Sequence, residues 1–334
     1  MTLQNRAAGA LYGLALGDAL GMPTQMLSRP QIVARYGPML TGFHPAACDH
    51  PLAAGMPAGA ITDDTEQALL LARLLLDGKG SVDAAELARR LVAWEEDMRA
   101  RGSLDLLGPS TKRAVEQVLA GTPVDEVGRY GTTNGAAMRI APVGIAVAST
   151  DPVALVDRVV EASRLTHNTG VALAGAAAVA AAVSAGLDGA SVSEAVEVAV
   201  SAARLAGGRG HWVAAADVAE RIVWATELVR GLDAAQVCDR VYVLVGTSLA
   251  TQESVPAAFA VLAACPDDPW QAVLLGASVG GDCDTIAAIA GAVGGACHGV
   301  DAFPAEARET LVRVNPQLDL DATAAALLTL RGRP

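Results

Sequence analysis

The sequence predicts an all-α protein that folds as a single compact multi-helix domain. Apolar residues recur at helical spacing through most of the chain, and no segment alternates apolar and polar residues long enough to require a sheet. Hydrophobic residues make up 52% of the 334 residues and aromatic residues only 3%, so small side chains can pack helices closely against one another. No Pro/Gly/Ser-rich linker divides the chain, and we therefore expect one domain over residues 1–334.

Short connections containing Gly, Pro or Asp separate the predicted helices. The longest predicted loop, 37–60, is rich in Pro and Gly and leads directly to Thr62. The most apolar runs, 171–187 and 286–296, consist mainly of Ala, Val and Gly, and we interpret both as buried core helices rather than membrane spans. The predicted helices span residues 4–20, 64–78, 83–100, 110–120, 136–148, 152–165, 169–186, 192–206, 213–230, 234–249, 254–264, 269–278, 284–298, 304–314 and 321–330.

The charge and the cysteines restrict the classes of partner and compartment. A formal net charge of −12 and a pI near 4.8 argue against binding to nucleic acid or to an anionic membrane, because the long-range field repels phosphates. Five cysteines without CxxC spacing predict reduced thiols rather than a disulfide scaffold. The first residues lack the basic start and cleavage site of a signal peptide, so we expect a cytoplasmic protein.

Two short acidic motifs open apolar helices at distant points of the chain. They are TDDT at residues 62–65 and DCDT at residues 282–285. Capping of two independent helices is one interpretation, since Thr or Asp accepts hydrogen bonds from the first free N–H groups, but each motif carries more carboxylate than a cap needs. If the motifs face each other, their four carboxylates offset two divalent ions, and oxygen-only ligands favour Mg²⁺ or Mn²⁺ over zinc. Without metal, four buried carboxylates would repel one another.

Together with three further motifs, this pair resembles the ADP-ribosylglycohydrolase family. The other motifs are GDALG at 17–21, TNGAAMR at 133–139 and ESVP at 253–256, and all five occur in the family's order. The resemblance implies an all-α fold with a binuclear Mg²⁺ or Mn²⁺ site. It also implies an enzyme, a glycoside hydrolase that cleaves a bond at the anomeric carbon of a ribosyl group. The implied substrate is an ADP-ribosyl group on a small molecule or on the side chain of a protein target.

The same resemblance implies the residues of the site. The loop before the helix at 136–148 also has the glycine and small polar residues of a backbone that approaches a ligand. His167 has a second interpretation, since a lone histidine at a helix junction is more often a capping or core residue. The expected metal ligands are Thr62, Asp63, Asp64, Asp282, Asp284 and Thr285, with the four aspartates as catalytic residues; the expected substrate contacts are Gln25, Asn134, Gly135, Met138 and His167.

Two positions depart from the family pattern. Gln25 stands where many members carry a glutamate, and a glutamine can hydrogen-bond a ribose hydroxyl but cannot take a proton. Either a metal-site aspartate handles the proton, or another carboxylate moves in, or activity is reduced. Cys283 stands where threonine is more common, and we interpret that change as packing. Asp18 has two interpretations, a local acid or a buried hydrogen-bonding residue behind the site.

Two other functions fit the same residues. One is hydrolysis of a small nucleoside-like ribosyl metabolite, since the sequence shows no obvious protein-docking module. The other is a non-catalytic relative that binds ADP-ribose, which only Gln25 favours. The retained aspartate and threonine ligands weigh against a non-catalytic relative, because a structural descendant has little reason to keep a costly cluster of carboxylates.

Overall fold

A computed structural model describes residues 1–103 and 107–331 and consists almost entirely of helices, which confirms the predicted all-α class. Extended pairing among the described residues is limited to two isolated bridges, Thr133 with Ala250 and Thr169 with His211. Most helices contribute to one large cluster of buried apolar side chains. The helices are α1 (Leu3–Gly21), α2 (Arg29–Tyr36), α3 (Asp63–Asp77), α4 (Ala84–Ala100), α5 (Pro109–Leu119), α6 (Val124–Val127), α7 (Gly135–Met138), α8 (Ala141–Ala146), α9 (Pro152–Ser163), α10 (Gly170–Leu187), α11 (Val192–Gly207), α12 (Val218–Leu228), α13 (Ala234–Arg240), α14 (Thr251–Ala264), α15 (Pro269–Gly276), α16 (Cys283–His298), α17 (Ala305–Val314) and α18 (Leu320–Leu328).

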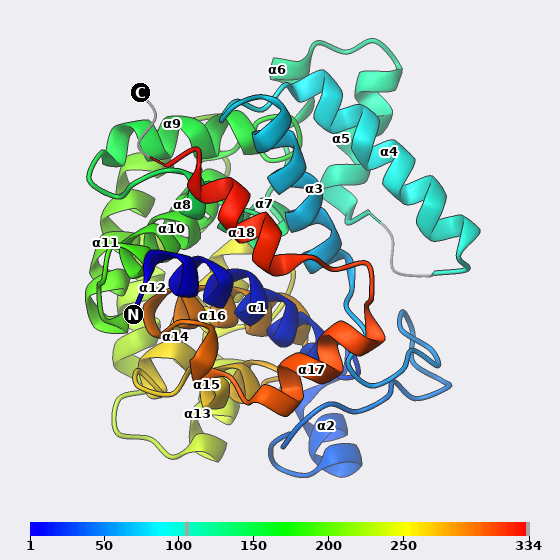
Figure 1. The fold of residues 1–334 in the computed structure, drawn as a ribbon, viewed down its shortest axis with the longest axis vertical. Helices are drawn as coiled ribbons and strands as arrows, with labels where there is room; N and C mark the ends of the chain where they lie inside the picture. The colour runs from blue at the N-terminus through cyan, green and yellow to red at the C-terminus, as the bar shows by residue number, and fades with distance from the viewer. Residues whose placement is uncertain (104–106, 332–334) are drawn as a thin grey trace.

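Helices α1 and α16 run side by side through the middle of the molecule (Figure 1). A Cβ atom added at Gly13 would lie 1.9 Å from the carbonyl oxygen of Gly291, and one added at Gly17 would lie 2.1 Å from that of Ala287. The two backbones therefore touch directly, and a side chain at these positions would force the helices apart. The glycines of α1 that make this contact recur every fourth residue, at Gly9, Gly13, Gly17 and Gly21.

The two helices run antiparallel, so the end of α1 meets the start of α16. Gly9 faces Gly295 near one end of the pair, and a Cβ at Gly21 would lie 2.3 Å from the Cα of Asp284 at the other. The second acidic motif is thereby placed next to the last turn of α1, which carries Asp18.

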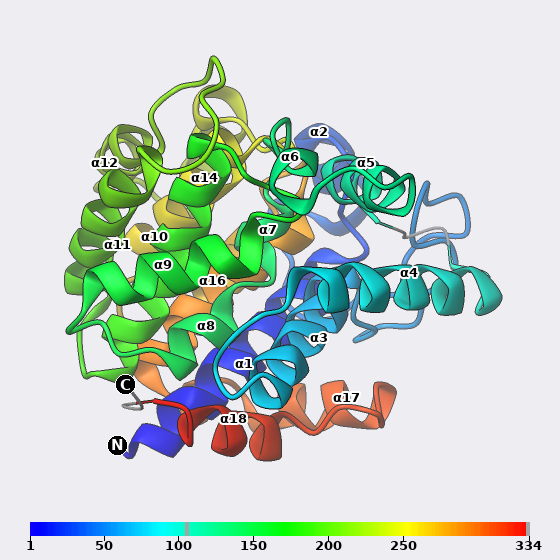
Figure 2. The same cartoon turned by 90° about the horizontal axis from the view of Figure 1, so that it is seen from above.

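The other helices surround this pair. Helices α11 and α12 lie on one side of it, and α4 and α5 lie at the opposite edge of the molecule (Figure 2). Helix α10 lies within the core and is the one helix of the described ranges that is long and apolar enough to span a bilayer. Because 89% of its apolar window is buried in the protein, α10 has the properties of the core helix that the sequence predicts.

Two helices were not predicted. Helix α2 lies in a segment that the sequence left unassigned, and it begins with a capping box in which Ser28 and Gln31 bond each other's backbone N–H groups. The short α6 follows Pro123. The predicted long loop at 37–60 is present, and no helix interrupts it.

Three predicted helices were too long. The segment 136–148 divides into α7 and α8, because Pro142 lies in the first turn of a new helix rather than inside one long helix. The segment 234–249 continues from α13 as a π-helical turn, Val241–Val245, and ends at Gly246, whose φ of 88° suits glycine. The segment 213–230 becomes helical only after Asp217, whose side chain caps α12.

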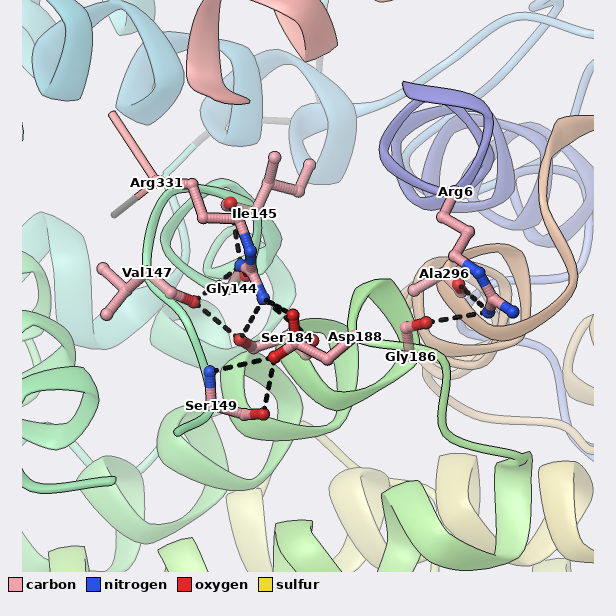
Figure 3. Close-up of polar contacts among 10 residues, drawn as sticks. All are labelled: Arg6, Gly144, Ile145, Val147, Ser149, Ser184, Gly186, Asp188, Ala296 and Arg331. Carbon is pink, nitrogen blue, oxygen red and sulfur yellow. Dashed lines mark hydrogen bonds and ion pairs between the residues drawn. The ribbon is translucent and has the colours of Figure 1, made fainter. Parts of the chain in front are cut away.

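Two arginines bond the free carbonyl groups at helix ends (Figure 3). Arg331 donates to the carbonyl oxygens of Gly144, Ile145 and Val147 at the end of α8, at 2.8–3.0 Å, and to Asp188 at 2.7 Å. Arg6 reaches the carbonyl oxygens that end α10 and α16, at 2.8 Å for Gly186 and 3.1 Å for Ala296. The helix ends around α10 are therefore joined through charged donors from the two ends of the chain.

The contact between α1 and α16 predicts a strong effect of one added methyl group. We expect Gly13→Ala to lower the free energy of unfolding by more than about 2 kcal/mol, because the new Cβ overlaps the backbone of α16. Gly207→Ala is the control, since a Cβ there meets only Ala174 at 4.0 Å and should change stability by less than about 1 kcal/mol. Urea unfolding of both variants measures the difference, and equal stabilities would contradict direct backbone contact.

Candidate functional site

The two acidic motifs open into one cavity of about 250 Å³. Thr62 and Asp282 are the N-cap residues of α3 and α16, although neither side chain makes a capping hydrogen bond, and residues from both helix beginnings line the same space. A larger cavity of about 680 Å³, on the side of α3 that faces α4, contains none of the predicted site residues. The predicted residues that line the smaller cavity are Gln25, Asp63, Asp64, Asn134, Gly135, Met138, Asp282, Asp284 and Thr285.

Asp18 holds the beginning of α3 from behind this cavity. It is fully buried, and it accepts hydrogen bonds from the hydroxyl of Thr62 at 2.7 Å and from that of Thr65 at 2.5 Å, as well as from both backbone amides. Burial raises the pKa of Asp18 to about 6, and these hydrogen bonds oppose the rise. Of its two interpretations, Asp18 is therefore the buried hydrogen-bonding residue, and it directs the Thr62 proton toward itself.

The carboxylates of the cavity are short of compensating partners. Asp64 is 1% exposed, and its Oδ1 has no hydrogen-bond partner, while Oδ2 accepts only a long bond of 3.3 Å from Thr285. Burial raises the pKa of Asp64 well above its ordinary value, and the neighbouring Asp284 and Asp63 carboxylates raise it further. Asp282 accepts a bond from Asn134, yet burial still raises its pKa to about 6. Full ionisation of this group therefore requires added positive charge.

The donor chemistry of the cavity suits a hard cation. The six predicted ligands offer only carboxylate and hydroxyl oxygens, and the buried Asp64 Oδ1 is one such oxygen with no protein partner. Thr62 lies just behind the lining, with its proton bonded to Asp18, which leaves its lone pairs for another contact. Within residues 1–103 and 107–331, however, no three His, Cys, Asp or Glu side chains already surround a common point. The binuclear centre therefore stays a prediction.

Another part of the cavity wall comes from the segment around α7. Asn134 donates to Ser254 at 2.8 Å and to Asp282, so it fixes one carboxylate while it lines the cavity. A Cβ at Gly135 would lie 3.1 Å from the ring of His167, so a larger residue at this position would require the ring to shift by a few tenths of an ångström. His167 is fully buried and lies behind the wall rather than in it. A direct contact between His167 and the substrate stays a prediction.

A buried arginine connects this wall to the first acidic motif. Arg139 is 1% exposed and donates to Gln67 at 3.2 Å, and Gln67 in turn donates to Asp63 at 3.0 Å. Burial lowers the pKa of Arg139 to about 10, and the Asp63 charge opposes that change, so the guanidinium stays protonated at neutral pH. Arg139 therefore reaches the half-buried Asp63 carboxylate through the Gln67 amide.

A model of the ADP-ribosylglycohydrolase family matches residues 1–334. The chain belongs to the ADP-ribosylglycohydrolase family. The predicted family, fold type and enzyme class, a glycoside hydrolase, are thereby confirmed.

Relatives within this family cover nearly the whole chain. The uncharacterized protein YegU of Escherichia coli (strain K12) is 38% identical over 327 residues, which cover 98% of this chain and 97% of YegU. The ADP-ribosyl-[dinitrogen reductase] glycohydrolase of Rhodospirillum rubrum is 27% identical and covers 91% of this chain and 89% of its own. A solved structure of an ADP-ribosylglycohydrolase-related protein complex superposes with a TM-score of 0.69 at 26% identity, over 98% of both chains.

In this member of the family, Gln25 is held at the cavity through its backbone. His50 lies 2.9 Å from the Gln25 carbonyl oxygen through Nε2, and its Nδ1 accepts bonds from the amides of Leu52 and Ala53, so Nε2 carries the proton that is donated. The Gln25 side chain is 4% exposed, and its Nε2 is buried with no partner. The predicted long loop thus supports a polar amide that is available to a ligand. No signal in the sequence around residues 48–50 indicated that His50 would support Gln25.

The buried position of His167 predicts an imidazole that does not take up a proton near neutral pH. Burial lowers the pKa of His167 well below its ordinary value, and the Arg139 guanidinium lowers it further. We expect the His167 ring to stay neutral at pH 6, where a histidine with a pKa near 6.5 is mostly protonated. Because only the unfolded chain then binds this proton, His167 costs stability as the pH falls below about 6.5. An NMR titration of the ring signals that shows His167 protonated at pH 6 would contradict this environment.

Proposed function

We propose that this chain hydrolyses the glycosidic bond at the anomeric carbon of an ADP-ribosyl group with the help of two Mg²⁺ or Mn²⁺ ions. The observation that carries the proposal is the convergence of both acidic motifs on one cavity, beside the polar wall of Asn134 and Gly135. Family membership and the named activity of the Rhodospirillum rubrum relative support the same bond type.

The ions would be held by the ligand set that the sequence predicts. Asp63 and Asp64 come from the start of α3, and Asp282 and Asp284 from the start of α16, with Thr62 and Thr285 as hydroxyl ligands. When bound, such ions polarise the oxygens they contact and offset the negative charge of the four carboxylates. The protein orients this set before any ion binds, because Asp18 fixes Thr62 and Asn134 fixes Asp282.

The remaining side chains bind and orient the sugar. Gln25 presents an amide that can donate to or accept from a hydroxyl group but cannot remove a proton, so its role is binding. Met138 supplies an apolar surface to the cavity, and Asn134 and Gly135 line it beside Met138. Proton transfer therefore falls to a group other than residue 25.

A small ribosyl metabolite is the second candidate substrate. The cavity volume of about 250 Å³ lies below the range of roughly 300–1,000 Å³ that is common for drug-sized ligands. A ribosyl group fits this volume more readily than a complete ADP-ribosyl group does, unless the diphosphate extends beyond the cavity. A protein target carrying ADP-ribose remains a candidate partner, because only the terminal ribose needs to enter.

Product release from a defined panel tests the function. ADP-ribosyl-arginine, ADP-ribosyl-serine, O-acetyl-ADP-ribose and plain nucleosides are incubated with protein and Mg²⁺ or Mn²⁺, and products are identified by mass spectrometry. We expect metal-dependent release from one class, and a loss of at least about 100-fold in Asp284→Asn, because a ligand of the proposed centre is removed. Asp97→Asn, at a carboxylate that is 65% exposed, is the control and should keep full activity. Undiminished release after chelation would contradict the metal-dependent mechanism.

Stability without substrate provides a separate prediction. In EDTA, Asp64→Asn should raise the melting temperature, because it removes a buried carboxylate whose pKa is raised by burial and by its neighbours. With Mn²⁺ at about 100 times its Kd, the wild type should gain about 2.7 kcal/mol and the variant much less. Thermal unfolding of the wild type and of Asp64→Asn in EDTA and in Mn²⁺ measures whether their order of stability reverses. The same order of stability with and without Mn²⁺ would contradict cation binding by Asp64.

A further inference from the structure

We infer that Thr133 is a substrate-binding residue that donates a hydrogen bond to an oxygen atom of the substrate, and that the buried Arg139 sets the direction of this donation through Thr166 and His167. This inference rests on the proposed function, because it names a further contact in the same cavity. It assigns a binding role to Thr133 and positioning roles to Arg139, Thr166 and His167.

The direction of hydrogen-bond donation is set first at Arg139, because a guanidinium group donates hydrogen bonds and accepts none. One branch runs from Nη1 to Gln67 at 3.2 Å and from Gln67 to Asp63 at 3.0 Å. The other branch runs from Nη2 to the hydroxyl oxygen of Thr166 at 2.6 Å. Both branches end at the cavity, since Asp63 and Thr133 line it. The buried cation therefore sets the polarity of two opposite parts of the site.

The position of the Thr166 proton fixes the tautomer of the histidine. Thr166 Oγ1 accepts from Arg139, so its single proton must point to another acceptor. The choices are His167 Nδ1 at 2.7 Å and the Ser163 carbonyl oxygen at 3.5 Å, and only the first lies within the normal O–H donor range. The proton therefore points to Nδ1, and the neutral ring carries its own proton on Nε2.

Because His167 Nε2 carries a proton, Thr133 accepts a hydrogen bond from it and can donate its own hydroxyl proton elsewhere. His167 Nε2 lies 2.9 Å from Thr133 Oγ1, which accepts the ring proton and keeps its own proton for another partner. Thr133 is half-buried and lines the cavity. Burial keeps the His167 ring neutral, so this direction persists at neutral pH. The opposite direction would place a ring proton toward Thr166 and would leave the Thr166 proton only the Ser163 carbonyl oxygen at 3.5 Å.

A donor at this place selects an acceptor oxygen on the ligand. Four carboxylates also line the cavity, and they attract cations and hydroxyl protons. Thr133 instead offers a proton to the cavity from the segment that precedes α7. The partner of Thr133 is therefore an uncharged or anionic acceptor oxygen. An ADP-ribosyl ligand has such oxygens on both its ribose and its phosphates.

Neutron diffraction from deuterium-exchanged crystals of the wild-type protein tests the direction without any substitution. We expect deuterium on His167 Nε2 and on the Thr166 hydroxyl pointing to a bare Nδ1. Deuterium on His167 Nδ1 would overturn the inference, because the Thr133 hydroxyl would then donate its hydrogen bond to His167 Nε2 instead of to the substrate.

Binding of products tests the role of Thr133. Calorimetric titration in the presence of Mg²⁺ compares ADP-ribose with ADP for the wild type, Thr133→Val and Thr133→Ser. We expect Thr133→Val to weaken ADP-ribose binding about tenfold, which is typical of one lost hydrogen bond, and Thr133→Ser to restore it. An equal loss for ADP assigns the acceptor to a phosphate, and a loss for ADP-ribose alone assigns it to the ribose.

The outcomes separate this inference from the proposed function. Tight ADP-ribose binding by the wild type and equally tight binding by Thr133→Val would overturn the Thr133 assignment and leave the proposed function intact. Absence of ADP-ribose binding by the wild type would contradict the proposed function and the assignment together. A loss in Thr133→Val that Thr133→Ser does not restore would identify a packing effect and would also overturn the assignment.

Discussion

The site depends on the direct backbone contact between α1 and α16. Glycines at every fourth position of α1 let the two helices approach until a Cβ at Gly13 would overlap Gly291. This approach places Gly21 against Asp284, and it places Asp18 close enough to accept the hydrogen bonds that begin α3. Two acidic motifs that lie more than two hundred residues apart along the chain therefore meet at one cavity because of a backbone contact that the glycines of α1 allow.

Charge compensation explains the surroundings of that cavity. Four carboxylates at two helix beginnings are favoured by the helix dipoles, but burial and mutual repulsion raise the pKa of Asp64 and Asp282. The protein meets part of this cost with neutral donors, such as Asn134, and with a buried cation that reaches Asp63 through Gln67. The rest of the negative charge remains available for cations, which is the physical basis of the proposed metal dependence.

The fold class and the two acidic motifs could be predicted from local signals, whereas the place of Gln25 and Met138 in the cavity lining was implied by the family resemblance. Helical periodicity is local, and TDDT and DCDT each contain, within four residues, more carboxylates than a helix cap needs. The Gly-x-x-x spacing on α1 was visible but was not used, and Pro142 could have indicated the break between α7 and α8. The branch through Thr166 and Thr133 could not be predicted, because its hydrogen bonds join residues from separate segments and depend on the folded distances.

Anomalous X-ray diffraction from crystals soaked in Mn²⁺ tests the central claim most directly, because it locates the ions without reference to any substrate. The account predicts two anomalous peaks about 3.5–4 Å apart between the aspartates of α3 and those of α16. A cavity without anomalous density at saturating Mn²⁺, or peaks that contact only one of the two motifs, would contradict the claim that the α1–α16 contact assembles a binuclear metal site.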